Sequence, residues 1–134
     1  MKKVLVTGVT GFLGHHCATE LIKNGYFVKG TVRDLSRKNE VLNGIKKEVD
    51  PNEKIEFVKL DLLKDDGWED SVKGCEYILH VASPSSVDEP SHEDEYIKPT
   101  VEGTKRVLKY ALKAKIKRFV LTSSIVSLMG VVCD

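Results

Sequence analysis

The chain alternates between short apolar runs and longer segments in which apolar and charged positions recur with helical spacing. Runs of this length, rich in valine, isoleucine, leucine and aromatic residues, predict strands that are buried in a parallel sheet. They cover residues 3–7, 26–32, 55–60, 76–81 and 117–122. The segments between them predict helices at 15–24, at 35–49, at 65–72 and in a stretch that ends near 114.

Glycine and proline residues mark several ends of these predicted elements. Asn24 and Gly25 form a favourable helix C-cap before the second strand, and Pro51 ends the segment 35–49. Pro99 lies within the last helical segment, where it either kinks the helix or marks its effective start. Because strands alternate with helices, we expect right-handed crossovers and an α/β fold. The predicted architecture is a doubly wound parallel sheet (a Rossmann fold) with strand order 3-2-1-4-5.

Composition and charge narrow the class of protein further. The 134 residues fit one domain, with 41% hydrophobic and 31% charged residues, which is typical of a soluble globular protein. A net charge of +1 gives no electrostatic case for nucleic acid or for an anionic membrane as a partner. No apolar run is long enough to span a bilayer, and the first residues lack a signal-peptide pattern. We therefore expect a cytoplasmic protein.

Cysteine and histidine positions give no indication of a metal or disulfide framework. Cys17, Cys75 and Cys133 are odd in number and far apart, which is consistent with a reducing compartment. The histidines at 15, 16 and 92 lack metal-ligand spacing, so we expect no metal site. His80 and Trp68 are interpreted as packing residues rather than as a catalyst and a pocket residue.

Three glycines with the spacing G-x-x-G-x-x-G follow the first predicted strand. Gly8 can form the tight turn that leaves the strand, and Gly11 lets the backbone approach a pyrophosphate. Gly14 lets the following helix pack close to the sheet. The amino-terminal end of that helix offers unpaired N–H groups and a positive dipole to an anion. This arrangement predicts a dinucleotide site, whereas an ordinary glycine-containing βα turn is the alternative.

Several sequence words along the chain resemble those of the extended short-chain dehydrogenase/reductases, specifically the dihydroflavonol 4-reductase and cinnamoyl-CoA reductase group. They occur in the family's order and cover nearly the whole chain. The words are VTGVTGFLG (6–14), GYFVKGTVRD (25–34), LDL (60–62), HVASP (80–84), EYIKPTVEGT (95–104) and RFVLTSS (118–124). The resemblance implies a Rossmann domain that binds NADPH and an enzyme that reduces the carbonyl of a phenolic or flavonoid-like small molecule.

The resemblance and the chemistry together assign candidate site residues. The glycine turn should hold the pyrophosphate, the family's Asp-Leu pair should contact adenine, and the fourth strand should end beside the cofactor. The expected cofactor-binding residues are Gly8, Thr10, Gly11, Phe12, Leu13, Arg33, Asp61, Leu62, Val81, Ala82, Ser83, Thr122 and Ser123. Asp61 could instead be a turn or N-cap residue. The resemblance assigns Ser124 a catalytic role, in which its hydroxyl polarises the substrate carbonyl.

The end of the second strand distinguishes NADP from NAD. Val32 occupies the position where NAD enzymes place a carboxylate, and Arg33 resembles the family's phosphate-binding arginine. Asp34 could hold a ribose of NAD or could cap the next helix. Many family members have a lysine seven residues after the arginine, but here that residue is Glu40. Arg37 or Lys38 could replace the lysine or lie on a solvated helix face. We favour NADP.

The family's proton donor is a tyrosine followed four residues later by a lysine, and no tyrosine of this sequence has lysine at that distance. The chain therefore resembles the cofactor-binding N-terminal half of a longer reductase, and we expect 1–134 to be an incomplete, inactive Rossmann domain. Two other functions stay open: an inactive NADP(H)-binding or interaction module, and an NAD-dependent sugar-nucleotide epimerase or dehydratase. The apolar segment 125–134 also predicts self-association.

Overall fold

The computed structural model describes residues 1–84, 92, 94–125 and 127 of the chain. Its centre is a parallel five-stranded sheet with the order β3-β2-β1-β4-β5, which confirms the predicted Rossmann topology. The strands are β1 (Lys3–Thr7), β2 (Phe27–Val32), β3 (Ile55–Lys59), β4 (Tyr77–His80) and β5 (Arg118–Leu121). Each lies within two residues of its predicted bounds at either end.

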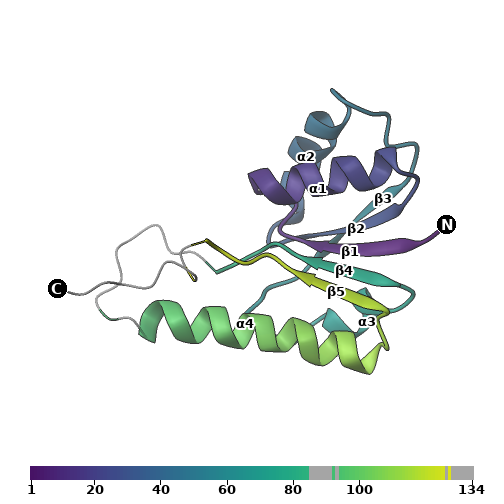
Figure 1. The fold of residues 1–134 in the computed structure, drawn as a ribbon. Helices are drawn as coiled ribbons and strands as arrows, with labels where there is room; N and C mark the ends of the chain where they lie inside the picture. Colours follow the sequence, from purple (N-terminus) through teal and green to yellow (C-terminus); the bar gives the residue numbers. More distant parts are fainter. Residues whose placement is uncertain (85–91, 93, 126, 128–134) are drawn as a thin grey trace.

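Helices cover both faces of the sheet, as Figure 1 shows. One face carries α1 (Phe12–Lys23) and α2 (Lys38–Ile45), which is preceded by the short 3-10 helix η1 (Leu35–Arg37). The other face carries α3 (Trp68–Val72) and α4 (Asp94–Lys113). The glycine turn joins β1 to α1 at the carboxyl edge of the sheet, where ligands bind in open α/β folds.

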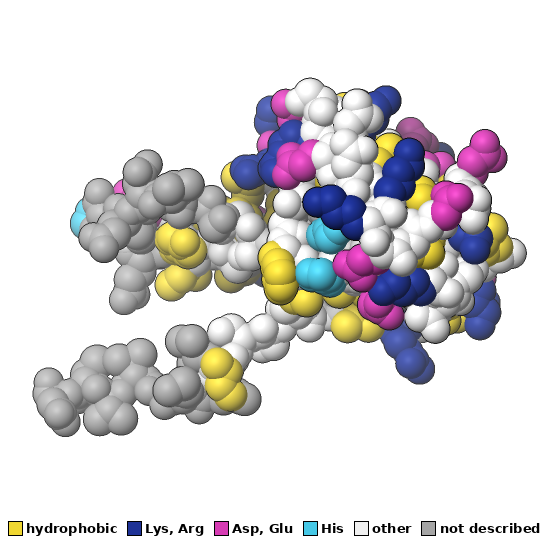
Figure 2. All heavy atoms as spheres, turned by 90° about the horizontal axis from the view of Figure 1, so that it is seen from above, with side chains coloured by type: hydrophobic (Ala, Val, Ile, Leu, Met, Phe, Trp, Pro, Cys, Tyr) yellow, Lys and Arg dark blue, Asp and Glu magenta, His cyan; other side chains and the backbone are white. Residues whose placement is uncertain are grey.

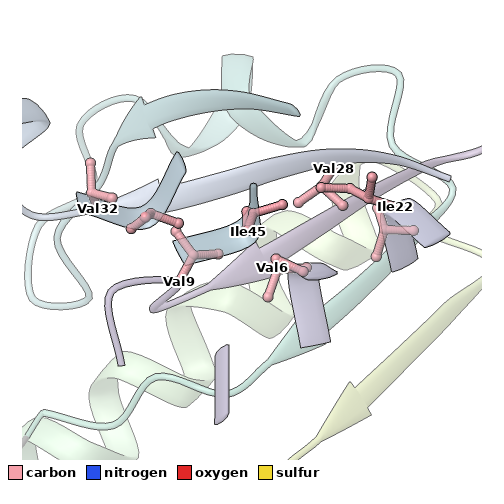
Figure 3. Packing of buried hydrophobic residues seen from close by; sticks show 9 residues of the cluster. Val6, Val9, Ile22, Val28, Val32 and Ile45 are labelled. Carbon is pink, nitrogen blue, oxygen red and sulfur yellow. The ribbon is translucent and has the colours of Figure 1, made fainter. Parts of the chain in front are cut away.

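The core consists of two apolar layers, one on each side of the sheet, because neighbouring side chains of a strand point to opposite faces. Val4 and Val6 of β1 face α1 and α2, and Figure 3 shows Val6 beside Ile22 and Ile45 in this layer. Leu5 faces the opposite way, toward α3 and α4, where it joins Ile78 in the second layer.

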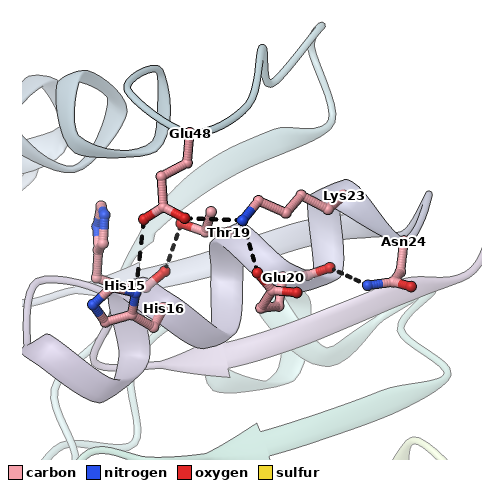
Figure 4. A network of polar contacts seen from close by, with 7 residues as sticks. All are labelled: His15, His16, Thr19, Glu20, Lys23, Asn24 and Glu48. Carbon is pink, nitrogen blue, oxygen red and sulfur yellow. Dashed lines mark hydrogen bonds and ion pairs between the residues drawn. The ribbon is translucent and has the colours of Figure 1, made fainter.

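A polar network ties α1 to the segment that follows α2 (Figure 4). The Lys23 ammonium lies 2.8 Å from a carboxylate oxygen of Glu20 and 2.9 Å from one of Glu48. The Lys23 hydrogen bond holds the pKa of Glu48 below its usual value. His16 Nδ1 lies 3.8 Å from the same carboxylate. Figure 2 views this face of the molecule and shows basic and acidic side chains interspersed across it.

The helices differ from their predicted bounds more than the strands do. The first helix begins at Phe12 rather than at residue 15, since Gly11 serves as its N-cap. The predicted helix 35–49 is a 3-10 turn followed by α2, which ends at Ile45. Pro99 lies inside α4, so the interpretation that it marks the helix start is wrong; a missing N–H in the first turns leaves the rest of a 20-residue helix intact.

In the described part of the chain, no helix is both long enough and apolar enough to cross a membrane. Cys17 and Cys75 are free thiols, and burial raises the pKa of each. Cys133 lies outside the described residues.

Candidate cofactor-binding site

A hollow of about 320 Å³ opens at the carboxyl edge of the sheet, beside the glycine turn. It lies among residues that follow β1, β2, β3 and β4, so four separate segments of the sequence meet there. Most of the predicted cofactor-binding residues line it: Gly8, Thr10, Gly11, Leu13, Arg33, Asp61, Leu62, Val81, Ala82 and Ser83. Gly14, Thr31, Val32, Leu60, Leu63, Trp68 and Pro84 complete the lining.

The glycine turn is held by contacts that leave no space for side chains at two of its positions. Gly8 has a φ of +74°, and a Cβ there would lie 2.9 Å from the Cβ of Ala82. A Cβ on Gly14 would collide with the carbonyl group of Gly8, at 2.8 Å from its carbon. Gly14 thus lets α1 approach the turn itself, whereas the sequence interpretation placed the close approach at the sheet.

Gly11 differs from these two glycines, because a Cβ there would meet only the Gly8 oxygen at an ordinary distance of 3.5 Å. No packing within the described residues therefore requires glycine at this position, which lines the hollow. The Gly11 N–H donates to Gly8 O at 3.0 Å, and the Gly11 carbonyl accepts from His15 N–H at 2.9 Å. The N–H groups of the first helical turn have no intrahelical partner and can serve an anion.

Thr7 and His80, at the ends of β1 and β4, hold the floor of the site in place. The Thr7 hydroxyl oxygen accepts the N–H groups of Val81 and Ala82, each at 3.0 Å. It lies 2.9 Å from His80 Nδ1, and His80 is buried. His80 is a packed strand residue, as the sequence predicted. The role of Thr7 was missed, because its partners lie more than 70 residues away in the sequence.

The end of β2 presents the cation of Arg33 to the hollow, whose lining does not include Asp34. Val32 is buried, with 3% of its surface exposed, while Arg33 is exposed and lines the hollow. Asp34 caps η1: its Oδ1 accepts the Ser36 N–H at 2.9 Å, and the hydrogen bonds from Ser36 lower the pKa of Asp34. The capping interpretation of Asp34 is therefore confirmed.

Arg37 is engaged within its own helical segment. Its guanidinium donates two hydrogen bonds to Glu40, at 2.9 and 2.8 Å. These bonds raise the pKa of Arg37 and lower the pKa of Glu40. Glu40 stands where many family members have a lysine. It thus binds Arg37, the arginine that could have taken the role of that lysine.

Asp61 and Trp68 shape the wall of the hollow after β3. The Asp61 Oδ1 accepts the N–H of Leu63 at 2.9 Å, so this residue forms a turn as well as lining the site. The indole N–H of Trp68 donates to the Asp61 carbonyl at 3.0 Å. Trp68 is fully buried, which confirms its packing role, and its ring stacks on Tyr110 with centroids 6.3 Å apart.

Four predicted site residues do not line the hollow. Phe12, 83% exposed, lies in a neighbouring hollow, where its ring contacts that of His16 with centroids 4.6 Å apart. Residues 122–124 are exposed after β5, and Thr122 N–H donates to His80 O at 3.0 Å. The Ser127 hydroxyl donates to the Ser124 carbonyl at 2.6 Å. The described residues contain no cluster of side chains that could hold a metal ion.

A parallel sheet with a glycine turn, a helix amino terminus and a cation at the end of β2 defines the class of dinucleotide-binding Rossmann domains. The chain belongs to the NAD-dependent epimerase/dehydratase family, whose sequence pattern matches residues 4–133. This confirms the resemblance to the extended short-chain dehydrogenase/reductases. Family members include reductases, so the chain is related to oxidoreductases that bind NAD(P).

Among curated relatives, the chain is similar to dihydroflavonol 4-reductase of Arabidopsis thaliana, at 39% identity over 126 residues. That match covers 92% of this chain and 32% of the relative. Anthocyanidin reductase of Arabidopsis thaliana is 38% identical, with 92% of this chain and 36% of the relative covered. The chain thus spans about a third of the length of these relatives.

Solved structures show the same fold. Vestitone reductase from alfalfa (Medicago sativa) is 34% identical, with a TM-score of 0.73 over 92% of this chain and 36% of that protein. The yeast methylglyoxal/isovaleraldehyde reductase, solved in complex with NADPH, is 28% identical. Its TM-score is 0.75 over 91% of this chain and 37% of that protein.

Proposed function

We propose that this chain is the cofactor-binding part of an NADP(H)-dependent carbonyl reductase. The observation that carries the proposal is the end of β2, where Arg33 lines the hollow and Val32 takes the position of the NAD enzymes' acid, whereas Asp34 caps η1 and is not part of the lining. The similar yeast reductase was solved with NADPH, which supports the same cofactor here. Dihydroflavonol 4-reductase and its relatives support a small carbonyl compound as the substrate class.

The residues of the hollow fit a dinucleotide. The glycine turn and the first turn of α1 would bind the pyrophosphate through backbone N–H groups. Arg33 would bind the 2′-phosphate of the adenosine ribose, since a guanidinium pairs bidentately with phosphate oxygens. Asp61 and Leu62 would contact adenine, and Val81, Ala82 and Ser83 would lie beside the remaining part of the cofactor. Thr122 and Ser123, after β5, would also contact the cofactor.

When bound, NADPH supplies a hydride to the carbonyl carbon of the substrate. Ser124 would donate a hydrogen bond to the carbonyl oxygen, on which negative charge develops during reduction. The proton that completes the alcohol needs a general acid, for which the family resemblance implies a Tyr-x-x-x-Lys pair. The 134 residues contain no such pair.

Arg33→Ala should weaken NADPH binding about ten- to hundredfold and leave NADH binding nearly unchanged. The variant loses a charge-assisted hydrogen bond worth about 1.5–3 kcal/mol. Calorimetric titration of both cofactors into the wild type and the variant measures this effect. Equal affinities of the wild type for NADPH and NADH would refute the proposal and would favour an NAD-dependent function.

The 134-residue polypeptide should bind NADPH without reducing a carbonyl. General acid catalysis contributes about 10²–10⁴-fold, and its donor is absent from the sequence. Absorbance at the NADPH band, followed with a panel of aromatic aldehydes and ketones, checks this expectation. Turnover that disappears in Ser124→Ala but persists in a Ser127→Ala control would show that the proton donor is misassigned.

A further inference from the structure

A second hollow, of about 450 Å³, adjoins the proposed cofactor site at the end of β3. Its lining consists of Arg33, Lys59, Asp61, Lys64 and Asp66. Arg33 and Asp61 line both hollows, so the second extends outward from the first. Three cations and two carboxylates surround the space, and one carboxylate oxygen, Asp61 Oδ1, is already bonded to a backbone N–H. The five lining side chains together carry a formal charge of +1.

Lys59 is positioned by the register of the sheet. It is the last residue of β3 and pairs with Val32, the last residue of β2. The next residue, Leu60, donates its N–H to Val32 O at 3.0 Å, which fixes the two strand ends relative to each other. Arg33 follows Val32 directly. Cations from two adjacent strands therefore border the same hollow, at the level where each strand ends.

In the part of the chain that the structure describes, neither Arg33 nor Lys59 forms an ion pair with a carboxylate. The charge of Lys59 contributes to the lowered pKa of Asp34, after the larger effect of the Ser36 hydrogen bonds, so the ammonium lies near the β2 end. Arg37 contrasts with both, because Glu40 occupies its guanidinium with two hydrogen bonds. Arg33 and Lys59, unlike Arg37, are therefore available to an incoming anion.

We propose that Lys59 is a specificity-determining residue that binds the 2′-phosphate of NADP(H) together with Arg33. A phosphate monoester carries about 1.5–2 negative charges near pH 7, and one guanidinium neutralises only part of this charge. An ammonium from the neighbouring strand supplies the remainder as a point charge. The inference rests on the proposed NADP(H) function. It places the second cation on β3, because Glu40 stands where many family members have a lysine.

Calorimetric titration of the 134-residue chain with NADPH and NADH tests this assignment in Lys59→Gln. We expect NADPH affinity to fall about two- to fivefold, as for an exposed ionic contact, with NADH affinity unchanged. Lys59→Arg should retain most of the NADPH preference. A matched variant, Lys47→Gln, removes a positive charge from a residue that does not line either hollow and should leave the ratio of affinities unchanged.

The outcomes separate this inference from the proposed function. If Arg33→Ala loses the NADPH preference while Lys59→Gln keeps it, the role of Lys59 is refuted and the proposed function stands. A Lys59→Gln variant that binds both cofactors more weakly by the same factor would also refute it, because a structural role gives that result. If the wild type does not discriminate between the cofactors, both proposals are wrong. Thermal melting of each variant verifies that it is folded before titration.

Discussion

At the scale of single residues, the Thr7–His80 contact fixes the protonation state of a buried imidazole. Both acceptor sites of the Thr7 hydroxyl are used by the N–H groups of Val81 and Ala82. Its hydrogen is therefore donated to His80 Nδ1, which must accept, so the ring is neutral with its proton on Nε2. Burial lowers the pKa of His80 from 6.5 to about 4, in agreement with this arrangement.

This histidine should make stability depend on pH over a defined interval. Above pH 6.5 the imidazole is neutral in both folded and unfolded chains, and its contribution is complete. Between pH 6.5 and about 4 only the unfolded chain binds the proton, so unfolding becomes easier by up to about 1.4 kcal/mol per pH unit as pH falls. Below about pH 4 both states bind the proton, and this loss ends.

Urea unfolding of the wild type and of His80→Asn across this interval measures the effect. The asparagine carbonyl can accept from Thr7 but does not titrate, so the variant should show a shallower fall in stability between pH 6.5 and 4. Carboxylates titrate in both proteins, and the difference between the two curves isolates the histidine. Parallel curves would mean that His80 is not buried in its neutral form.

At the scale of elements, the sequence predicted strands better than helix ends. The strands are short runs of apolar residues bounded by polar ones, and burial in a parallel sheet needs little else. Helix ends depend on caps: Gly11 begins α1 three residues early, and Asp34 caps a 3-10 turn before α2 begins. The sequence did indicate Asp34 as a cap, but Gly11 makes no side-chain cap hydrogen bond, so no capping side chain marks where α1 begins.

The site shows the same division. Gly8, Gly11 and the residues after β4 could be placed from the sequence, because carboxyl ends of parallel strands meet at one edge. The contacts of Thr7 with His80 and of Val32 with Leu60 join strands that are distant in the sequence, and only their register brings them together. Likewise, only the structure shows that Glu40 binds the Arg37 guanidinium and that Lys59 has no such carboxylate partner among the described residues. Phe12 and residues 122–124 keep their proposed roles as predictions.

At the scale of the whole molecule, apolar side chains are exposed on the helix α4 and on the strand β5. On α4 they recur with helical spacing at Ile97, Val101, Leu108 and Leu112. On β5, which lies at one edge of the described sheet, Val120 and Leu121 are about half exposed. Ile125 is also exposed, whereas Val126, Leu128, Met129, Val131 and Val132 of the predicted apolar segment lie outside the described residues.

These surfaces lead us to expect that the 134-residue polypeptide associates with itself as its concentration rises. An apolar helix face beside an edge strand gains more by burial against a second copy than scattered apolar residues do. Sedimentation velocity over a range of concentrations measures the association, with and without residues 125–134. Replacing Leu112, which is 79% exposed, by serine should weaken it, and Leu35→Ser, which alters an exposed leucine on η1, should not. A monomer at all concentrations would contradict the prediction. Association that persists unchanged in Leu112→Ser and is lost on removing residues 125–134 would assign the contact to that segment alone.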